Sequence, residues 1–320
     1  MKKMQKAGIL LLVLVLALTA CTSFADTGER GTTMNNIDGR QQTEFRYNRF
    51  ADLFYYLLAH MPIDYAADVS DPGYTAEMAG CLGVYPGIPQ RLINYYQDNF
   101  DRLAVINFMS LAAENPGQFR EMLAGCGMLT DKDMTYFVDP LIEICDRVSG
   151  TFYQWWKDHH TETAQQAEKV YSRFRALTDR FGSFFADLGM DTQVLFSYSL
   201  RKNGRAFNQQ NALVVYLTYP EKPEDITDCF LQFLHECTHS VTDPMMSGEI
   251  RMDDGSHDIA EYQVLCFDEY LIEALCPDLS GAYRDWIGEE NLEVSRKMLG
   301  ETGENRLKER LKQMIPGGTI

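Results

Sequence analysis

The chain of 320 residues is poor in positive charge: 29 Lys and Arg residues stand against 46 Asp and Glu residues, which gives a formal charge of −17. Such a chain repels a polyanion before any specific contact forms, so we expect no nucleic-acid partner. The hydrophobic fraction of 45%, with 12% aromatic residues, is ample for a packed core. A wholly disordered chain is therefore excluded.

The sequence has no Cys-x-x-Cys pair, which argues against a cysteine-based zinc site or a thioredoxin-type motif. Eight cysteines are present. When Cys21 is set aside the number is odd, so outside the cytoplasm at least one thiol must be free. We interpret most of these cysteines as small buried apolar residues.

Long apolar runs are also missing, apart from residues 8–18, and that run is shorter than the roughly 20 residues of a membrane-spanning helix. Lysines precede it, and Leu-Thr-Ala-Cys, ending at Cys21, follows. This ending resembles the lipobox of bacterial lipoproteins. The resemblance implies cleavage before Cys21, a lipid on its thiol, and an exported chain anchored to the membrane of the cell envelope on the extracytoplasmic side. An uncleaved anchor, or ordinary signal-peptidase cleavage after Ala25, remains open.

We expect four regions along the chain. A signal peptide covers residues 1–20, and a polar, flexible tether covers 21–44. Apolar residues at helical spacing predict a mainly helical part over 45–190. The remaining part, 191–320, begins with two predicted strands, residues 194–200 and 211–219. An Asn-Gly turn signal between them predicts that they pair as a β-hairpin. The fold class expected is α+β.

A helix is predicted after the strands, because acidic residues at 224–225 suit its first turn. It contains the pattern His-Glu-x-x-His. His235 and His239 are one turn apart on the same face, so both imidazoles can reach one metal ion, and Glu236 lies beside them. The helix is expected to end near Asp243, where a proline follows. Asp243 either accepts a hydrogen bond from a ligand imidazole or simply ends the helix.

The nine residues HECTHSVTD, from His235 to Asp243, resemble the active-site helix of the thermolysin-type zincins, the gluzincins. The resemblance implies a zincin-like fold and a peptidase that acts on peptide or protein substrates. It also implies Zn²⁺ as the cofactor, His235 and His239 as ligands, Glu236 as the general base, and a glutamate on a following helix as the third ligand.

A helix predicted over residues 257–276 offers Glu261, Glu269 and Glu273 as the third ligand. In gluzincins the ligand usually has a polar or acidic residue four positions later. Glu269 has Glu273 there, whereas Glu261 has Leu265. The Asp-Glu-Tyr-Leu sequence around Glu269 also resembles the Asn-Glu-x-Leu pattern of several exported zincin families. Glu261 fits the spacing in thermolysin better, but we choose Glu269 and leave the other two open.

One feature of the sequence bears on how well such a site would catalyse hydrolysis. Thermolysin-type enzymes stabilise the oxyanion with a histidine well downstream, and no histidine follows Glu269. The substitutes available are Tyr270, Tyr283, Arg284, Arg251 and His257. The alternative function is therefore a catalytically weak or inactive zinc-binding lipoprotein that acts as a binding protein.

By analogy with zincins, the strand at 211–219 is the expected edge for an extended substrate. An amphipathic surface helix is predicted over 291–314, with an apolar face that includes Leu292, Val294, Met298, Leu307 and Leu311.

Overall fold

The computed structural model describes residues 43–61, 76, 87–103, 105–160, 164–189, 191–200, 204–209, 212–220, 222, 225–246 and 256–315. The predicted signal peptide, Cys21 and most of the predicted tether lie outside these residues. Within the described ranges, no helix combines the length and apolarity needed to cross a membrane. The fold is mostly helical around one small sheet, which agrees with the predicted α+β class.

The sheet has four strands in the order β1-β2-β4-β3. Strands β1 (Thr43–Tyr47), β2 (Asp191–Ser197) and β4 (Ala212–Thr218) are parallel, and β3 (Arg205–Gln209) pairs antiparallel with β4. The five central residues of β4 are all buried. A continuous apolar run of this kind is typical of a strand that is covered on both faces.

Three sequence predictions about the sheet are wrong. The two predicted strands exist as β2 and β4, but they are parallel neighbours, and it is β3 that forms the antiparallel partner of β4. Because β4 is paired on both sides, it has no free edge for a substrate; β3 lies at the edge of the described sheet. Strand β1 begins at Thr43, so the end of the predicted tether belongs to the sheet.

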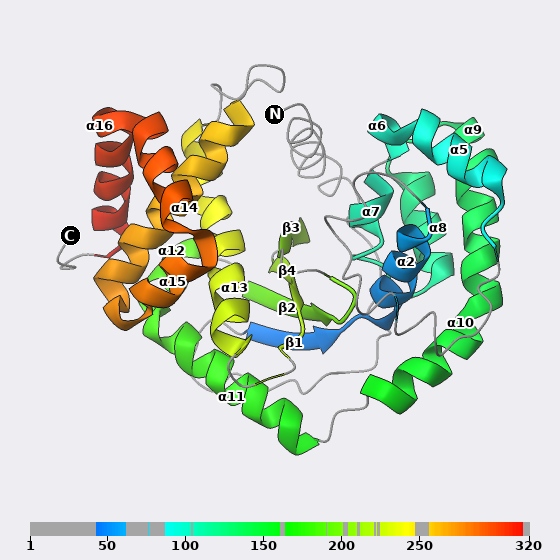
Figure 1. Ribbon diagram of the computed structural model, residues 1–320, viewed down its shortest axis with the longest axis horizontal. Coiled ribbons are helices and arrows are strands. Elements are labelled where there is room, and N and C mark those ends of the chain that lie inside the picture. Colours follow the sequence, from blue (N-terminus) through cyan, green and yellow to red (C-terminus); the bar gives the residue numbers. More distant parts are fainter. Residues whose placement is uncertain are drawn as a thin grey trace.

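The N-terminal helices lie to the right of the sheet in Figure 1. Their bounds are α2 (Arg49–Ala59), α5 (Gln90–Asp98), α6 (Phe100–Leu103), α7 (Val105–Met109), α8 (Pro116–Gly125), α9 (Asp131–Asp133), the π-helical turn η1 (Met134–Val138) and α10 (Asp139–His160). Asn48 joins α2 to this group. Its Oδ1 caps the helix by accepting from the backbone N–H of Ala51, and its Nδ2 donates to the carbonyls of Leu111 and Ala113.

Two further helices, α11 (Ala164–Arg180) and α12 (Gly182–Leu188), connect the N-terminal helices to the rest of the chain. Phe174 of α11 shows how this connection is packed. Its ring lies 6.5 Å from that of Phe196 on β2 and 5.5 and 5.2 Å from those of Phe230 and Phe233. The hydrophobic core is therefore shared between the predicted helical part and the C-terminal part.

The C-terminal helices lie on the left in Figure 1. They are α13 (Asp225–Thr242), the 3₁₀ turn η2 (Asp243–Met246), α14 (Ser256–Leu275), the 3₁₀ turn η3 (Pro277–Leu279), α15 (Ser280–Ile287) and α16 (Glu289–Met314). The predicted helices over 225–243, 257–276 and 291–314 are thus confirmed within one or two residues.

The predicted apolar face of α16 is only partly correct. Leu292, Leu307 and Leu311 are buried, whereas Val294 and Met298 are 42% and 56% exposed. Gly300 has a φ of +61° inside the helix, which interrupts the helical geometry. Val294 and Met298 both precede Gly300 and, at 3.6 residues per turn, lie roughly 200° and 240° around the helix from Leu292, so they point away from the buried face.

The described cysteines fit the interpretation made from the sequence. All of them are buried and free, namely Cys126, Cys145, Cys229, Cys237, Cys266 and Cys276. Cys81 lies outside the described residues.

Candidate metal centre

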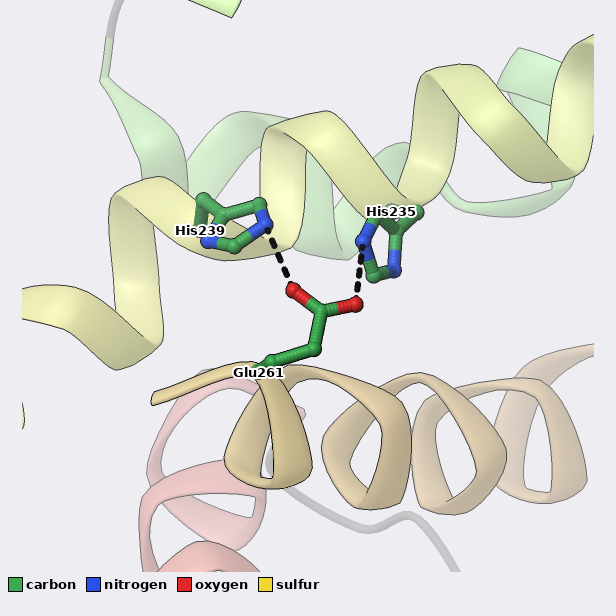
Figure 2. Close-up of side chains that lie close together, drawn as sticks. All are labelled: His235, His239 and Glu261. Carbon is green, nitrogen blue, oxygen red and sulfur yellow. Dashed lines mark ion pairs between the residues drawn. The ribbon is translucent and has the colours of Figure 1, made fainter. Parts of the chain in front are cut away.

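His235 and His239 of α13 and Glu261 of α14 converge on one point, as Figure 2 shows. Nε2 of His235 lies 3.5 Å from Oε1 of Glu261, and Nε2 of His239 lies 3.8 Å from Oε2 of the same carboxylate. One ligand atom from each of the three residues lies within 4.8 Å of the others. This group can hold a metal ion.

A carboxylate lies beside the second nitrogen of each imidazole. Oδ2 of Asp268 is 2.9 Å from Nδ1 of His235, and Oδ1 of Asp243 is 3.2 Å from Nδ1 of His239. Such contacts fix the tautomer and the ring orientation, so that Nε2 is the nitrogen presented to Glu261. Of the two roles left open for Asp243, the structure supports contact with the imidazole.

The carboxylates give the site a negative potential. Burial lowers the pKa of His235, but Glu261, Asp268 and Glu236 outweigh burial and raise it to about 10. The pKa of His239 is also raised: burial is the largest single effect and lowers it, but the hydrogen bond with Asp243 and the negative charges of Asp243 and Glu236 together outweigh burial. The potential that favours a proton on these rings also favours a metal cation, because both are positive charges that compete for the same nitrogens.

Glu236, next to His235 on α13, lies close to Gly204. A Cβ atom placed on Gly204, directly before β3, would lie 2.8 Å from Cγ and 3.1 Å from Oε1 of Glu236. Only glycine permits this close approach between the start of the edge strand and the carboxylate. The partly buried side chain of Glu236 therefore lies against the residue directly before β3.

Glu269, chosen from the sequence as the third ligand, does not join the two histidines. It is 2% exposed and forms ion pairs with Arg296 of α16 and Arg284 of α15. Arg284 also pairs with Glu273 at 2.9 Å, so the third candidate from the sequence is likewise turned away. The structure therefore replaces Glu269 by Glu261 as the carboxylate beside His235 and His239.

The described candidates for an oxyanion donor are engaged elsewhere. The Tyr270 hydroxyl donates to Glu304 at 2.6 Å, and the Tyr283 hydroxyl donates to the carbonyl of Leu265 at 2.9 Å. Arg284 is held by the ion pairs given above. Arg251 and the side chain of His257 lie outside the described part of the chain.

Sequence reasoning missed Asp268, Gly204 and Trp286, whose ring lies 5.8 Å from that of His235. Of these three residues, only Asp268 could have been identified from the spacing in the sequence. It follows Glu261 by seven positions, which is two helical turns, so the two carboxylates share one face of α14. The expected spacing of four residues corresponds to one helical turn, whereas Asp268 follows Glu261 after two turns.

Comparison of the chain with protein-family models, with curated proteins and with solved structures finds no match.

Proposed function

We propose that this chain is a zinc-dependent peptidase of the zincin type that hydrolyses peptide bonds with Glu236 as its general base. The observation that carries the proposal is the convergence of His235, His239 and Glu261, with Glu236 next to His235 on the same helix. This convergence involves side chains from α13 and α14, so it is evidence beyond the His-Glu-x-x-His motif, which lies on α13 alone.

The donor set fits zinc. Two imidazole nitrogens and one carboxylate oxygen are the protein ligands of several catalytic zinc sites, where a fourth position is left for water or substrate. Bonds of about 2.0–2.1 Å in a tetrahedron place ligand atoms roughly 3.3 Å apart. The carboxylate of Glu261 lies near this range, with Oε1 3.5 Å from Nε2 of His235 and Oε2 3.8 Å from Nε2 of His239.

Each residue has a distinct role in the proposed reaction. When bound, zinc supplies Lewis acidity, which polarises the scissile carbonyl and lowers the pKa of a coordinated water to about 7. Glu236 accepts the proton of the attacking water and passes it to the leaving amine. Asp268 and Asp243 keep the imidazoles oriented throughout.

The edge of the sheet offers a place for an extended substrate. Strand β3 is at the edge of the described sheet, and Gly204 at its start lies against Glu236. A peptide added alongside β3 would therefore run past the general base. The net charge of −17 favours neutral or basic peptides over acidic ones.

The cellular setting rests on the sequence alone. The lipobox-like ending at Cys21 supports a chain that is exported and tethered to the cell envelope by a lipid. Metabolic labelling of the expressed protein with a fatty acid tests this part, since Cys21→Ala abolishes the label if Cys21 is the anchor.

One observation favours the second candidate, a catalytically weak zinc-binding protein. The described oxyanion candidates Tyr270, Tyr283 and Arg284 are all engaged away from the site. Removal of an oxyanion donor typically costs about 10²–10³-fold in turnover, so a site without one would bind a peptide better than it cleaves it.

The two candidates are separated by metal analysis and a peptidase assay on the same preparations. The peptidase hypothesis predicts one zinc per chain and cleavage of casein or of a peptide library by the wild type. It also predicts that Glu236→Gln keeps its zinc but no longer cleaves these substrates. Stoichiometric zinc without cleavage of any peptide would favour the binding protein. Absence of zinc, or zinc that persists in His239→Ala, would overturn the proposed metal centre.

A further inference from the structure

Gln232 is a buried polar residue on the metal-binding face of α13. It precedes His235 by three positions and Glu236 by four, so it lies on the same face one turn earlier. Its side chain is 3% exposed, and its amide oxygen Oε1 has no hydrogen-bond partner among the residues that the structure describes. The next residues, Phe233 and Leu234, are fully buried apolar side chains of the kind that usually fill such a position.

An unpaired amide in this place opposes folding. Buried polar groups are nearly always hydrogen-bonded, because leaving one unpaired forfeits the bonds it makes to water in the unfolded chain. An apolar side chain of the same length would avoid this penalty. Residues that break this rule beside a candidate active site are typically there for a ligand.

The surroundings indicate what kind of ligand would pair with the amide. Oε1 accepts hydrogen bonds, and the site carries the carboxylates of Glu236, one turn after Gln232 on α13, and of Glu261. A substrate group that donates a hydrogen bond suits both the acceptor and the negative potential, whereas an acidic group is repelled. An apolar group would leave the amide unpaired.

We infer that Gln232 is a specificity-determining residue, which binds a hydrogen-bond-donating side chain (an amide, hydroxyl or ammonium group) of a substrate residue next to the scissile bond. This inference rests on the proposed peptidase function. It assigns a role to a residue outside the metal ligands and the general base.

The test compares wild type with Gln232→Met, which keeps the length of the side chain and removes the amide. Quenched fluorescent peptides that carry Asn, Ser, Lys, Leu or Asp on either side of the cleaved bond serve as probes. At one of these positions, the wild type should prefer Asn, Ser or Lys over Leu. In the variant, the ratio of kcat/KM for the preferred peptide to kcat/KM for the Leu peptide should fall by about tenfold or more. Zinc content should not change.

Thermal unfolding without peptide gives a second readout. Gln232→Met should raise the midpoint, because an unpaired buried amide is removed. Thr242→Val is the matched control on the same helix: its hydroxyl is buried but donates to the carbonyl of Thr238 at 3.2 Å, so its loss should not raise the midpoint. It should also leave the peptide preference unchanged.

The outcomes distinguish a failure of the role of Gln232 from a failure of the proposed peptidase function. Cleavage with an unchanged preference in Gln232→Met overturns the role of Gln232 and leaves the peptidase standing. A lower midpoint or an unfolded variant also overturns it, because the amide then holds the fold together. Wild type that binds zinc but cleaves no probe overturns the peptidase, and the role of Gln232 falls with it.

Discussion

Oδ2 of Asp268 lies 2.9 Å from Nδ1 of His235, and this contact joins α14 to α13 directly behind the candidate metal site. Asp268 is fully buried, and its other oxygen, Oδ1, has no partner among the described residues. The carboxylate thus has one main interaction in the described structure, which is to hold the ring of His235. The orientation of the His235 ring therefore depends on a residue 33 positions away.

Removal of this carboxylate should weaken metal binding without removing a ligand. We expect Asp268→Ala to lower zinc affinity by about 10–100-fold, because the ring of His235 loses its orientation and basicity. Competition with a chromophoric chelator measures the affinity. Asp285→Ala, at an exposed position of α15, is the control and should bind zinc like the wild type. Equal affinities in both variants would contradict the role of Asp268.

Replacement of each candidate glutamate by glutamine should have opposite effects on zinc content and on stability. Glu261→Gln should lose most of its bound zinc and keep its stability, since the Glu261 side chain is 41% exposed. Glu269→Gln should keep zinc but lose roughly 1–3 kcal/mol of unfolding free energy, because Arg284 and Arg296 lose their shared partner. Metal analysis and urea unfolding measure the two effects. Loss of zinc in Glu269→Gln alone would restore the choice made from the sequence.

A methyl group at position 204 should displace Glu236, the proposed general base. The added Cβ of Gly204→Ala would lie 2.8 Å from Cγ of Glu236, so we expect turnover to fall by about 10²-fold while zinc content stays the same. Gly150→Ala in α10 is the control, because nothing lies within 4 Å of its added Cβ. Peptidase assays on both variants provide the measurement, and unchanged turnover in Gly204→Ala would count against the placement of Glu236.

One ion pair in the N-terminal helices should make stability depend on pH. Burial raises the pKa of Asp133, but hydrogen bonds from Arg102 and Thr130 outweigh it and hold this pKa well below its usual range. Arg102 donates twice to the carboxylate, both times at 2.7 Å. Because the unfolded chain takes up this proton near pH 3.9, the stabilisation is fully present above that value and is lost as pH falls towards the folded pKa.

Asp133→Asn should therefore be less stable than wild type at pH 7, and the difference should shrink as the pH is lowered below about 4. Urea unfolding of both proteins at several pH values measures the difference. Asp139→Asn is the control, because its pair with Arg120 is exposed and contributes little. A difference that grows as the pH falls would contradict the assignment.

The sequence by itself determined what is local along the chain. The positions of His235, Glu236 and His239 on one face, and the ends of α13, follow from helical periodicity and from the flanking acidic and proline residues, which act within one or two turns. The burial of the described cysteines and the α+β class followed from composition and pattern in the same way.

Only the tertiary structure decided which residues from elsewhere complete the site. Glu261 and Glu269 lie on the same helix, and the choice between them depends on how α14 is rotated against α13 and on the arginines of α15 and α16 that pair with Glu269. Strand pairing was decided in the same way: that β4 lies parallel to β2 and antiparallel to β3 depends on contacts between segments that no local pattern specifies. Packing between distant segments sets these contacts, and the free energy that selects among them is shared by the whole core.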